Sequence, residues 1–137
     1  MLDRKNRIKT MAVLFAAVIS LFLVRGGHAS LRTIAPCTIT GTPGPDLLVG
    51  TAHRDVICGL GGDDLISGLK GSDVIRGGPG NDKLQADSGR DVVYGGSGND
   101  LAYCYDGFVD RIDGGLGTDY ARFDRTLDRV RHVERFG

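Results

Sequence analysis

The chain has 137 residues, a length that accommodates one domain, and its 17 basic and 17 acidic residues give a formal net charge of zero. Glycine is abundant, with 22 residues, whereas tryptophan is absent. The sequence contains no basic patch with interleaved aromatic residues, so its composition argues against a nucleic acid as partner.

Residues 1–29 have the pattern of a secretory signal peptide. A basic stretch, MLDRKNRIKT, is followed by an uninterrupted apolar run from Met11 to Val24. Gly27 and Ala29 provide the small residues expected before a cleavage site. A membrane-spanning helix needs roughly 20 apolar residues, so this shorter run favours a cleaved Sec-type signal over an uncleaved membrane anchor. We therefore expect a secreted, extracellular protein.

Cleavage after Ala29 would leave an acidic chain. Five of the 17 basic residues and one of the 17 acidic residues lie in the signal, which leaves 12 and 16 and a net charge of −4. The next segment, residues 30–40, has the sequence SLRTIAPCTIT and is expected to form a leading strand or N-terminal cap. Ile39 precedes Leu48 by one repeat length, and this spacing places it in phase with the repeat that follows.

Three cysteines remain after export: Cys37, Cys58 and Cys104. Disulfides form in the oxidising compartments that secreted proteins pass through. Because three is an odd number, at most one intramolecular pair forms and one thiol is left over. We expect the pair that is nearer in sequence, Cys37–Cys58; the alternative is that all three cysteines stay unpaired.

From Gly41 to Tyr103 the sequence follows a nine-residue repeat without a gap. The seven units are GTPGPDLLV, GTAHRDVIC, GLGGDDLIS, GLKGSDVIR, GGPGNDKLQ, ADSGRDVVY and GGSGNDLAY. Their eighth position is always apolar, and their fourth is glycine except for His53. The sixth position is aspartate in every unit: Asp46, Asp55, Asp64, Asp73, Asp82, Asp91 and Asp100. A looser unit, CYDGFVDRID, spans residues 104–113, and a regular one, GGLGTDYAR, returns at residues 114–122.

This pattern resembles the haemolysin-type (RTX) calcium-binding nonapeptide repeat, G-G-x-G-x-D-x-U-x, in which U is a large apolar residue. The resemblance covers residues 41–122. It implies an all-β fold, a right-handed parallel β-roll or β-solenoid. In such a roll a six-residue turn binds calcium, a three-residue strand follows it, and two repeats form one coil.

Physical considerations support the same architecture. Three-residue strands are stable only when they stack on similar neighbours, and the eighth-position side chains then point inward as one thin core. Glycines let each turn adopt φ > 0 and direct carbonyl oxygens toward an ion, and Ca²⁺ takes six to eight oxygen ligands. Without metal the aligned carboxylates repel one another, so we expect metal binding and folding to be coupled. The alternative is a metal-free solenoid in which each aspartate caps its own turn.

Alternate turns are expected on opposite edges of the roll. We name the edge with turns 41–46, 59–64, 77–82, 95–100 and 114–119 the odd edge, and the other the even edge. The odd edge keeps glycine at its first and fourth positions, whereas the even edge loses one of these glycines at His53 and at Ala86. We therefore expect several calcium ions that fill the odd edge first. The candidate ligands are Asp46, Asp64, Asp82, Asp100 and Asp119 with Gly62, Gly80 and Gly98 on the odd edge, and Asp55, Asp73 and Asp91 on the even edge.

Residues 123–137 lack the turn pattern and are expected to cap the C-terminal end, either as a helix or as a closing strand. The seventh positions form outward columns that include Val56, Val74 and Val92. They are consistent with a half-exposed ladder or, alternatively, with an apolar patch that meets a partner.

We do not expect an enzyme, because the sequence has no H-E-x-x-H zinc motif and no glycine-rich phosphate loop with its lysine. The leading prediction is a small secreted calcium-binding β-roll, a monomer whose partners are calcium ions. The alternative is a calcium-rigidified adhesion or surface-interaction module that binds an envelope or partner protein through a flat sheet face.

Overall fold

The computed structural model describes residues 34–136, so the predicted signal segment, residues 1–29, lies outside the described residues. Within residues 34–136 every regular element is a β-strand. This part of the chain contains no helix long and apolar enough to cross a membrane.

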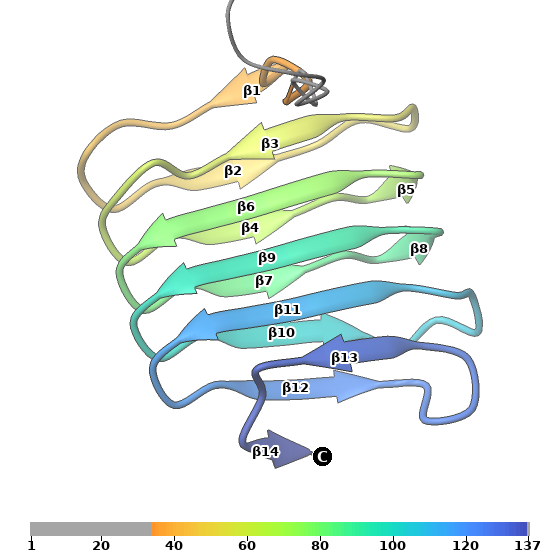
Figure 1. The fold of residues 1–137 in the computed structure, drawn as a ribbon. Helices are drawn as coiled ribbons and strands as arrows, with labels where there is room; N and C mark the ends of the chain where they lie inside the picture. Colours follow the sequence, from red (N-terminus) through yellow and green to blue (C-terminus); the bar gives the residue numbers. More distant parts are fainter. Residues whose placement is uncertain (1–33, 137) are drawn as a thin grey trace, which may run out of the picture. The chain divides into compact units, whose positions relative to one another are not determined.

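The strands form two six-stranded sheets and one small two-stranded sheet (Figure 1). The first sheet contains β1 (Ile39–Thr40), β3 (Val56–Cys58), β6 (Val74–Pro79), β9 (Val92–Ser97), β11 (Arg111–Leu116) and β13 (Arg129–Arg131). The second contains β2 (Leu47–Val49), β4 (Leu65–Ser67), β7 (Lys83–Gln85), β10 (Leu101–Cys104), β12 (Tyr120–Phe123) and β14 (Arg135–Phe136). The small sheet pairs β5 (Lys70–Gly71) with β8 (Ser88–Gly89).

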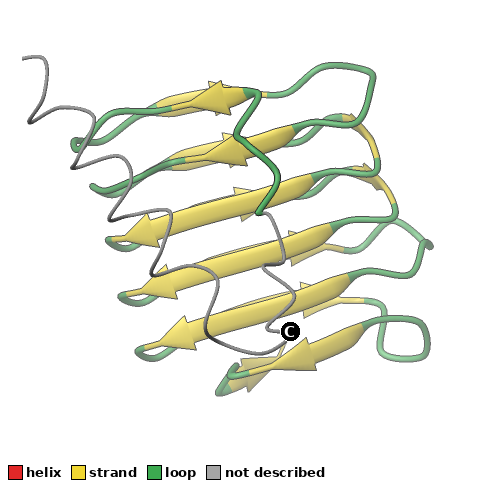
Figure 2. Ribbon diagram, turned by 45° about the horizontal axis from the view of Figure 1, so that its top comes forward, coloured by secondary structure: helices red, strands yellow, loops and turns green. Residues whose placement is uncertain are grey.

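Successive strands alternate between the two large sheets, and each strand pairs in parallel with the strand one coil further on (Figures 1 and 2). Paired residues hold the same position in units that are two repeats apart, as in the pairs Ile57–Ile75 and Ile66–Leu84. Two nine-residue repeats therefore make one coil, and the predicted parallel β-solenoid is confirmed. Its right-handed sense stays a prediction.

One extra residue in the turn at residues 104–110 is accommodated without breaking either sheet. Across this turn the paired residues are one position further apart in sequence, with Val93 opposite Ile112 and Ala102 opposite Ala121. The regular offset returns between Ile112 and Val130. The insertion is therefore confined to one turn of the even edge.

The core is a single column of inward side chains from each large sheet, as predicted. The eighth-position residues Ile57, Ile66, Ile75 and Leu84 are all 0% exposed, whereas the seventh-position Leu47 is 70% exposed. The alternation follows from the strand geometry, in which neighbouring side chains point to opposite faces. Because this core is thin, interactions within the turns must contribute much of the stability of the fold.

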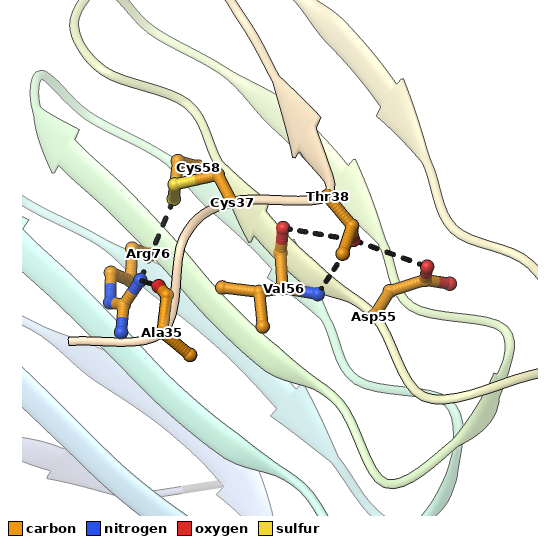
Figure 3. Close-up of a disulfide and its surroundings, with 7 residues drawn as sticks. All are labelled: Ala35, Cys37, Thr38, Asp55, Val56, Cys58 and Arg76. Carbon is orange, nitrogen blue, oxygen red and sulfur yellow. Dashed lines mark hydrogen bonds between the residues drawn. A yellow bond between two sulfur atoms is a disulfide. The ribbon is translucent and has the colours of Figure 1, made fainter. Parts of the chain in front are cut away.

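Val56 and Cys58 depart from this alternation, because both are buried although their positions face outward. The segment that precedes β1 crosses this face of the first sheet, as Figure 3 shows. The predicted disulfide between Cys37 and Cys58 is present and holds the segment in place, and Arg76 Nη1 donates to the carbonyl oxygen of Ala35 at 3.5 Å. Cys104 is the leftover thiol, and it is buried.

The sequence of the C-terminal segment is compatible with either a helix or a closing strand, and in the structure the segment is extended. Strands β13 and β14 add to the ends of the first and second sheets. Val130 lies opposite Ile112 and packs on the core, so it continues the inward column. The end of the roll is thus covered by a further coil of the same kind.

We predict that Ile75→Ala lowers the free energy of unfolding by about 2–5 kcal/mol, because it opens a cavity in a core that is one side chain wide. Urea unfolding in calcium-containing buffer measures the loss. The matched control is Leu47→Ala, an exposed position for which we expect a change within about 0.5 kcal/mol. Equal losses from the two variants would contradict the inward and outward assignment.

Candidate metal centre

The turns of both edges have positive φ at their second and fourth positions in the central coils. On the odd edge Gly78 and Gly80 have φ of 117° and 141°, and on the even edge Leu69 and Gly71 have φ of 70° and 141°. The left-handed region is unfavourable for a leucine, and the even edge still adopts it. The even edge therefore keeps positive φ at both positions despite its poorer match to the sequence pattern.

On the odd edge, the aspartate at the sixth position of a turn leaves no room for a side chain at the first position. A Cβ placed on Gly77 would collide with Oδ2 of Asp82 and would lie 2.6 Å from the carbonyl oxygen of Gly95. The carboxylate thus folds back into its own turn. On the even edge the first two turns also begin with glycine, at Gly50 and Gly68, whereas the next two begin with Ala86 and Cys104, whose side chains are both 0% exposed.

Successive aspartates of each edge are joined in a ladder of hydrogen bonds. Oδ1 of Asp82 accepts the backbone N–H of Asp64 at 2.9 Å, and Oδ1 of Asp100 accepts that of Asp82 at 2.9 Å. On the even edge Oδ1 of Asp91 accepts the N–H of Asp73 at 2.8 Å. Each carboxylate therefore bridges two coils through one oxygen and turns its other oxygen, Oδ2, into the turn.

Seven of these Oδ2 atoms are buried and have no hydrogen-bond partner in the described part of the chain. They belong to Asp64, Asp82, Asp100 and Asp119 on the odd edge and to Asp73, Asp91 and Asp110 on the even edge. A buried polar atom without a partner is strongly unfavourable, and a buried anionic one more so. These atoms mark where a cationic partner is needed.

The first turn of each edge is different, because its aspartate is satisfied within the turn. Oδ2 of Asp46 accepts from the backbone N–H and the hydroxyl of Thr42 at 2.5 and 2.9 Å. Oδ2 of Asp55 accepts from the same groups of Thr51 at 2.7 and 2.8 Å. In these two turns the aspartate therefore caps its own turn, as in the metal-free alternative. The sequence signal for this capping is a threonine at the second position, which occurs only in the two units that begin with GT.

The pKa values of the inner aspartates reflect this arrangement. Burial raises the pKa of Asp91 and of Asp100 to about 6 and that of Asp110 to about 7; a backbone hydrogen bond opposes the shift, and neighbouring carboxylates add to it. Burial also acts on Asp55, but the hydrogen bonds from Thr51 and Thr38 outweigh it and lower its pKa.

No lysine or arginine in residues 34–136 neutralises the ladder. The one salt bridge in that range joins His132 to Asp113, away from the sixth positions. Arg54 and Arg90 directly precede ladder aspartates on the even edge, yet both are exposed. The donor set that remains is carboxylate and carbonyl oxygen, which is what Ca²⁺ binds.

The ladder is longer than the sequence pattern indicated. Asp110 accepts the N–H of Asp91 at 2.8 Å, Asp128 accepts that of Asp110 at 2.8 Å, and Glu134 accepts that of Asp119 at 2.7 Å. Asp110 and Asp128 continue the nine-residue spacing once one extra residue is allowed at 104–110. Glu134 lies in a shortened last coil, where the spacing gives no signal.

A family model for the RTX calcium-binding nonapeptide repeat matches residues 38–66 and 67–102. These are RTX calcium-binding repeats. The stacked aspartates are consistent with the binding of several Ca²⁺ ions, and the RTX ladder extends beyond the matched residues to Asp119 and Asp128. No curated protein matches the chain.

We predict that the calcium-free RTX roll is more stable at pH 5 than at pH 8. Folded pKa values of about 6 to 7, against an ordinary 3.8, mean that the folded state binds more protons than the unfolded state in this range. Stability therefore falls as pH rises through the folded pKa values. The β signal of the chain in calcium-free buffer, followed by circular dichroism from pH 8 to pH 5, measures the trend and is expected to be larger at pH 5. A β signal that grows from pH 5 to pH 8 would be inconsistent with buried, unpaired aspartates.

Proposed function

We propose that the protein is a secreted calcium-binding β-roll in which Ca²⁺ binds between successive turns of both edges and completes the fold. The observation that carries this proposal is the set of seven buried Oδ2 atoms without partners, in two aligned columns. Calcium neutralises their charge and supplies the interaction that the thin core lacks. Folding and metal binding are then one equilibrium.

The ligands on the odd edge are Asp64, Asp82, Asp100 and Asp119, and those on the even edge are Asp73, Asp91 and Asp110. Backbone carbonyls complete the set on the odd edge, where the carbonyl oxygens of Gly62 and Gly80 lie against Gly80 and Gly98 of the next turn. Asp46 and Asp55 contribute less, because Thr42 and Thr51 already satisfy their inner oxygens.

Export to an oxidising, calcium-rich compartment accords with this function. The Cys37–Cys58 disulfide is of the kind that persists outside the reducing cytosol. Extracellular calcium modules bind with dissociation constants of about 10⁻⁴–10⁻³ M, a range that cytosolic calcium would not fill. The basic and apolar pattern of residues 1–29 supplies the export signal in this proposal.

A second candidate function is adhesion through a sheet face, with the protein acting as a binding module and not as an enzyme. It is favoured by the exposed apolar side chains of Leu47, Val49 and Leu65 at the N-terminal end of the second sheet, which are 70%, 50% and 42% exposed. Retention on cell-envelope material that requires both calcium and these side chains would distinguish adhesion from calcium binding alone.

The test is a calcium titration of the full-length chain by isothermal calorimetry and circular dichroism. We expect heat of binding together with a gain of β signal, and loss of both in EDTA. Asp82→Asn is expected to lower calcium affinity about tenfold, because it removes one of the charges that neutralise the ion. Asp46→Asn is the matched control, and its calcium affinity is expected to change less than about threefold.

Two outcomes would contradict the proposed function. One is the absence of calcium binding at millimolar concentration. The other is a full β signal in EDTA that calcium leaves unchanged.

A further inference from the structure

The irregular turn at residues 104–110 adds a third carboxylate to the even edge. Its sequence is CYDGFVD, and Asp106 stands where the other turns of this edge have Ala52, Lys70 or Ser88. One oxygen atom from each of Asp91, Asp106 and Asp110 lies within 4.8 Å of the other two. Among residues 34–136 this is the one group of three acidic, histidine or cysteine side chains that are so close.

Asp106 is held in place by backbone donors from two turns. Its Oδ2 accepts the N–H of Gly89 at 2.8 Å, and its Oδ1 accepts the N–H of Phe108 at 2.9 Å. Gly89 belongs to the turn one coil earlier, so Asp106 spans the gap between the coils. Its position beside Asp91 and Asp110 is therefore fixed before any ion arrives.

The two other carboxylates point unpaired atoms into the turns. Asp91 and Asp110 are each 1% exposed, and Oδ2 of each is buried without a hydrogen-bond partner. Burial raises the pKa of Asp110 to about 7, and Asp106 is the carboxylate that adds most to this shift. Arg122, the cation on the neighbouring strand, lies over the ring of Tyr105 at 5.8 Å and forms no ion pair in residues 34–136.

We propose that Asp91, Asp106 and Asp110 form a three-carboxylate calcium site, and that the first ion to enter the roll binds there. This inference rests on the proposed calcium-binding function and reverses the filling order expected from the sequence. A regular site has the sixth-position carboxylates of two successive turns. The affinity of calcium sites rises with ligand charge and with rigidity. Three carboxylates meet here, and two backbone N–H donors hold Asp106 in place.

The site reaches the surface of the roll at Asp106. This residue is half-buried and lines a groove of about 550 Å³ together with Gln85, Tyr103, Tyr105 and Arg122. Asp91 and Asp110 do not line the groove and are each 1% exposed, so Asp106 is the carboxylate of the three that faces it. Tyr103 and Tyr105 of this groove can report where an ion binds, because a tyrosine sensitises the luminescence of a lanthanide ion bound close to it.

The experiment follows tyrosine-sensitised luminescence of Tb³⁺, which accepts the same oxygen ligands as Ca²⁺, bound to the full-length chain. The chain has four tyrosines and no tryptophan, so the sensitiser is identifiable. We expect the first equivalent of Tb³⁺ to luminesce in the wild type and in Y94F/Y120F. We expect it to lose most of this emission in Y103F/Y105F, whose carboxylates are all intact.

Calorimetry with calcium itself tests the third carboxylate. Asp106→Asn is expected to weaken the first binding step at least about tenfold, because it removes one charge from the ion. The matched control is Asp124→Asn, which removes the same charge one coil further on, where Asp124 accepts the N–H of Gly107 at 2.7 Å. We expect the control to weaken that step less than about threefold.

The outcomes separate the two proposals. First-equivalent emission that disappears in Y94F/Y120F and persists in Y103F/Y105F would place the first ion elsewhere and overturn the three-carboxylate site. An unchanged first step in Asp106→Asn would overturn it too, while calcium binding by the roll would stand. A wild-type chain that binds neither ion overturns both.

Discussion

Parallel stacking of identical turns brings identical carboxylates together, and the rest of the structure depends on how that charge is balanced. Each inner aspartate uses Oδ1 to hold the backbone of the preceding coil and keeps Oδ2 buried and unpaired. The ladder therefore ties the coils together while it accumulates negative charge. The same side chains that define the architecture make it unfavourable without cations.

The N-terminal end of the roll balances this charge differently from its middle. At the N-terminal end the Cys37–Cys58 disulfide fixes the leading segment, and Thr42 and Thr51 satisfy the first aspartate of each edge. The inner coils have no such partners among the described residues. We infer a roll whose first coil is held by covalent and hydrogen bonds and whose later coils depend on metal.

The nine-residue period made the strands, the inward column and the assignment of turns to two edges predictable, because each follows from spacing alone. Spacing did not reveal that Asp55 is capped by its own threonine, since this depends on a hydroxyl at position two. It also missed Asp110 and Asp128, which follow an inserted residue, and Glu134, which substitutes for an aspartate in a shortened coil. The close approach of Asp106 to Asp91 is a contact between coils, and no local pattern encodes it.

Amide hydrogen exchange, resolved strand by strand with and without calcium, tests the central claim most directly. We predict that β6, β7, β9 and β10 lose most of their protection when calcium is removed, and that β3, next to the disulfide, loses least. Protection that is the same in every coil with and without calcium would show that the stacked aspartates are stable without a cation, and it would contradict a fold that depends on calcium.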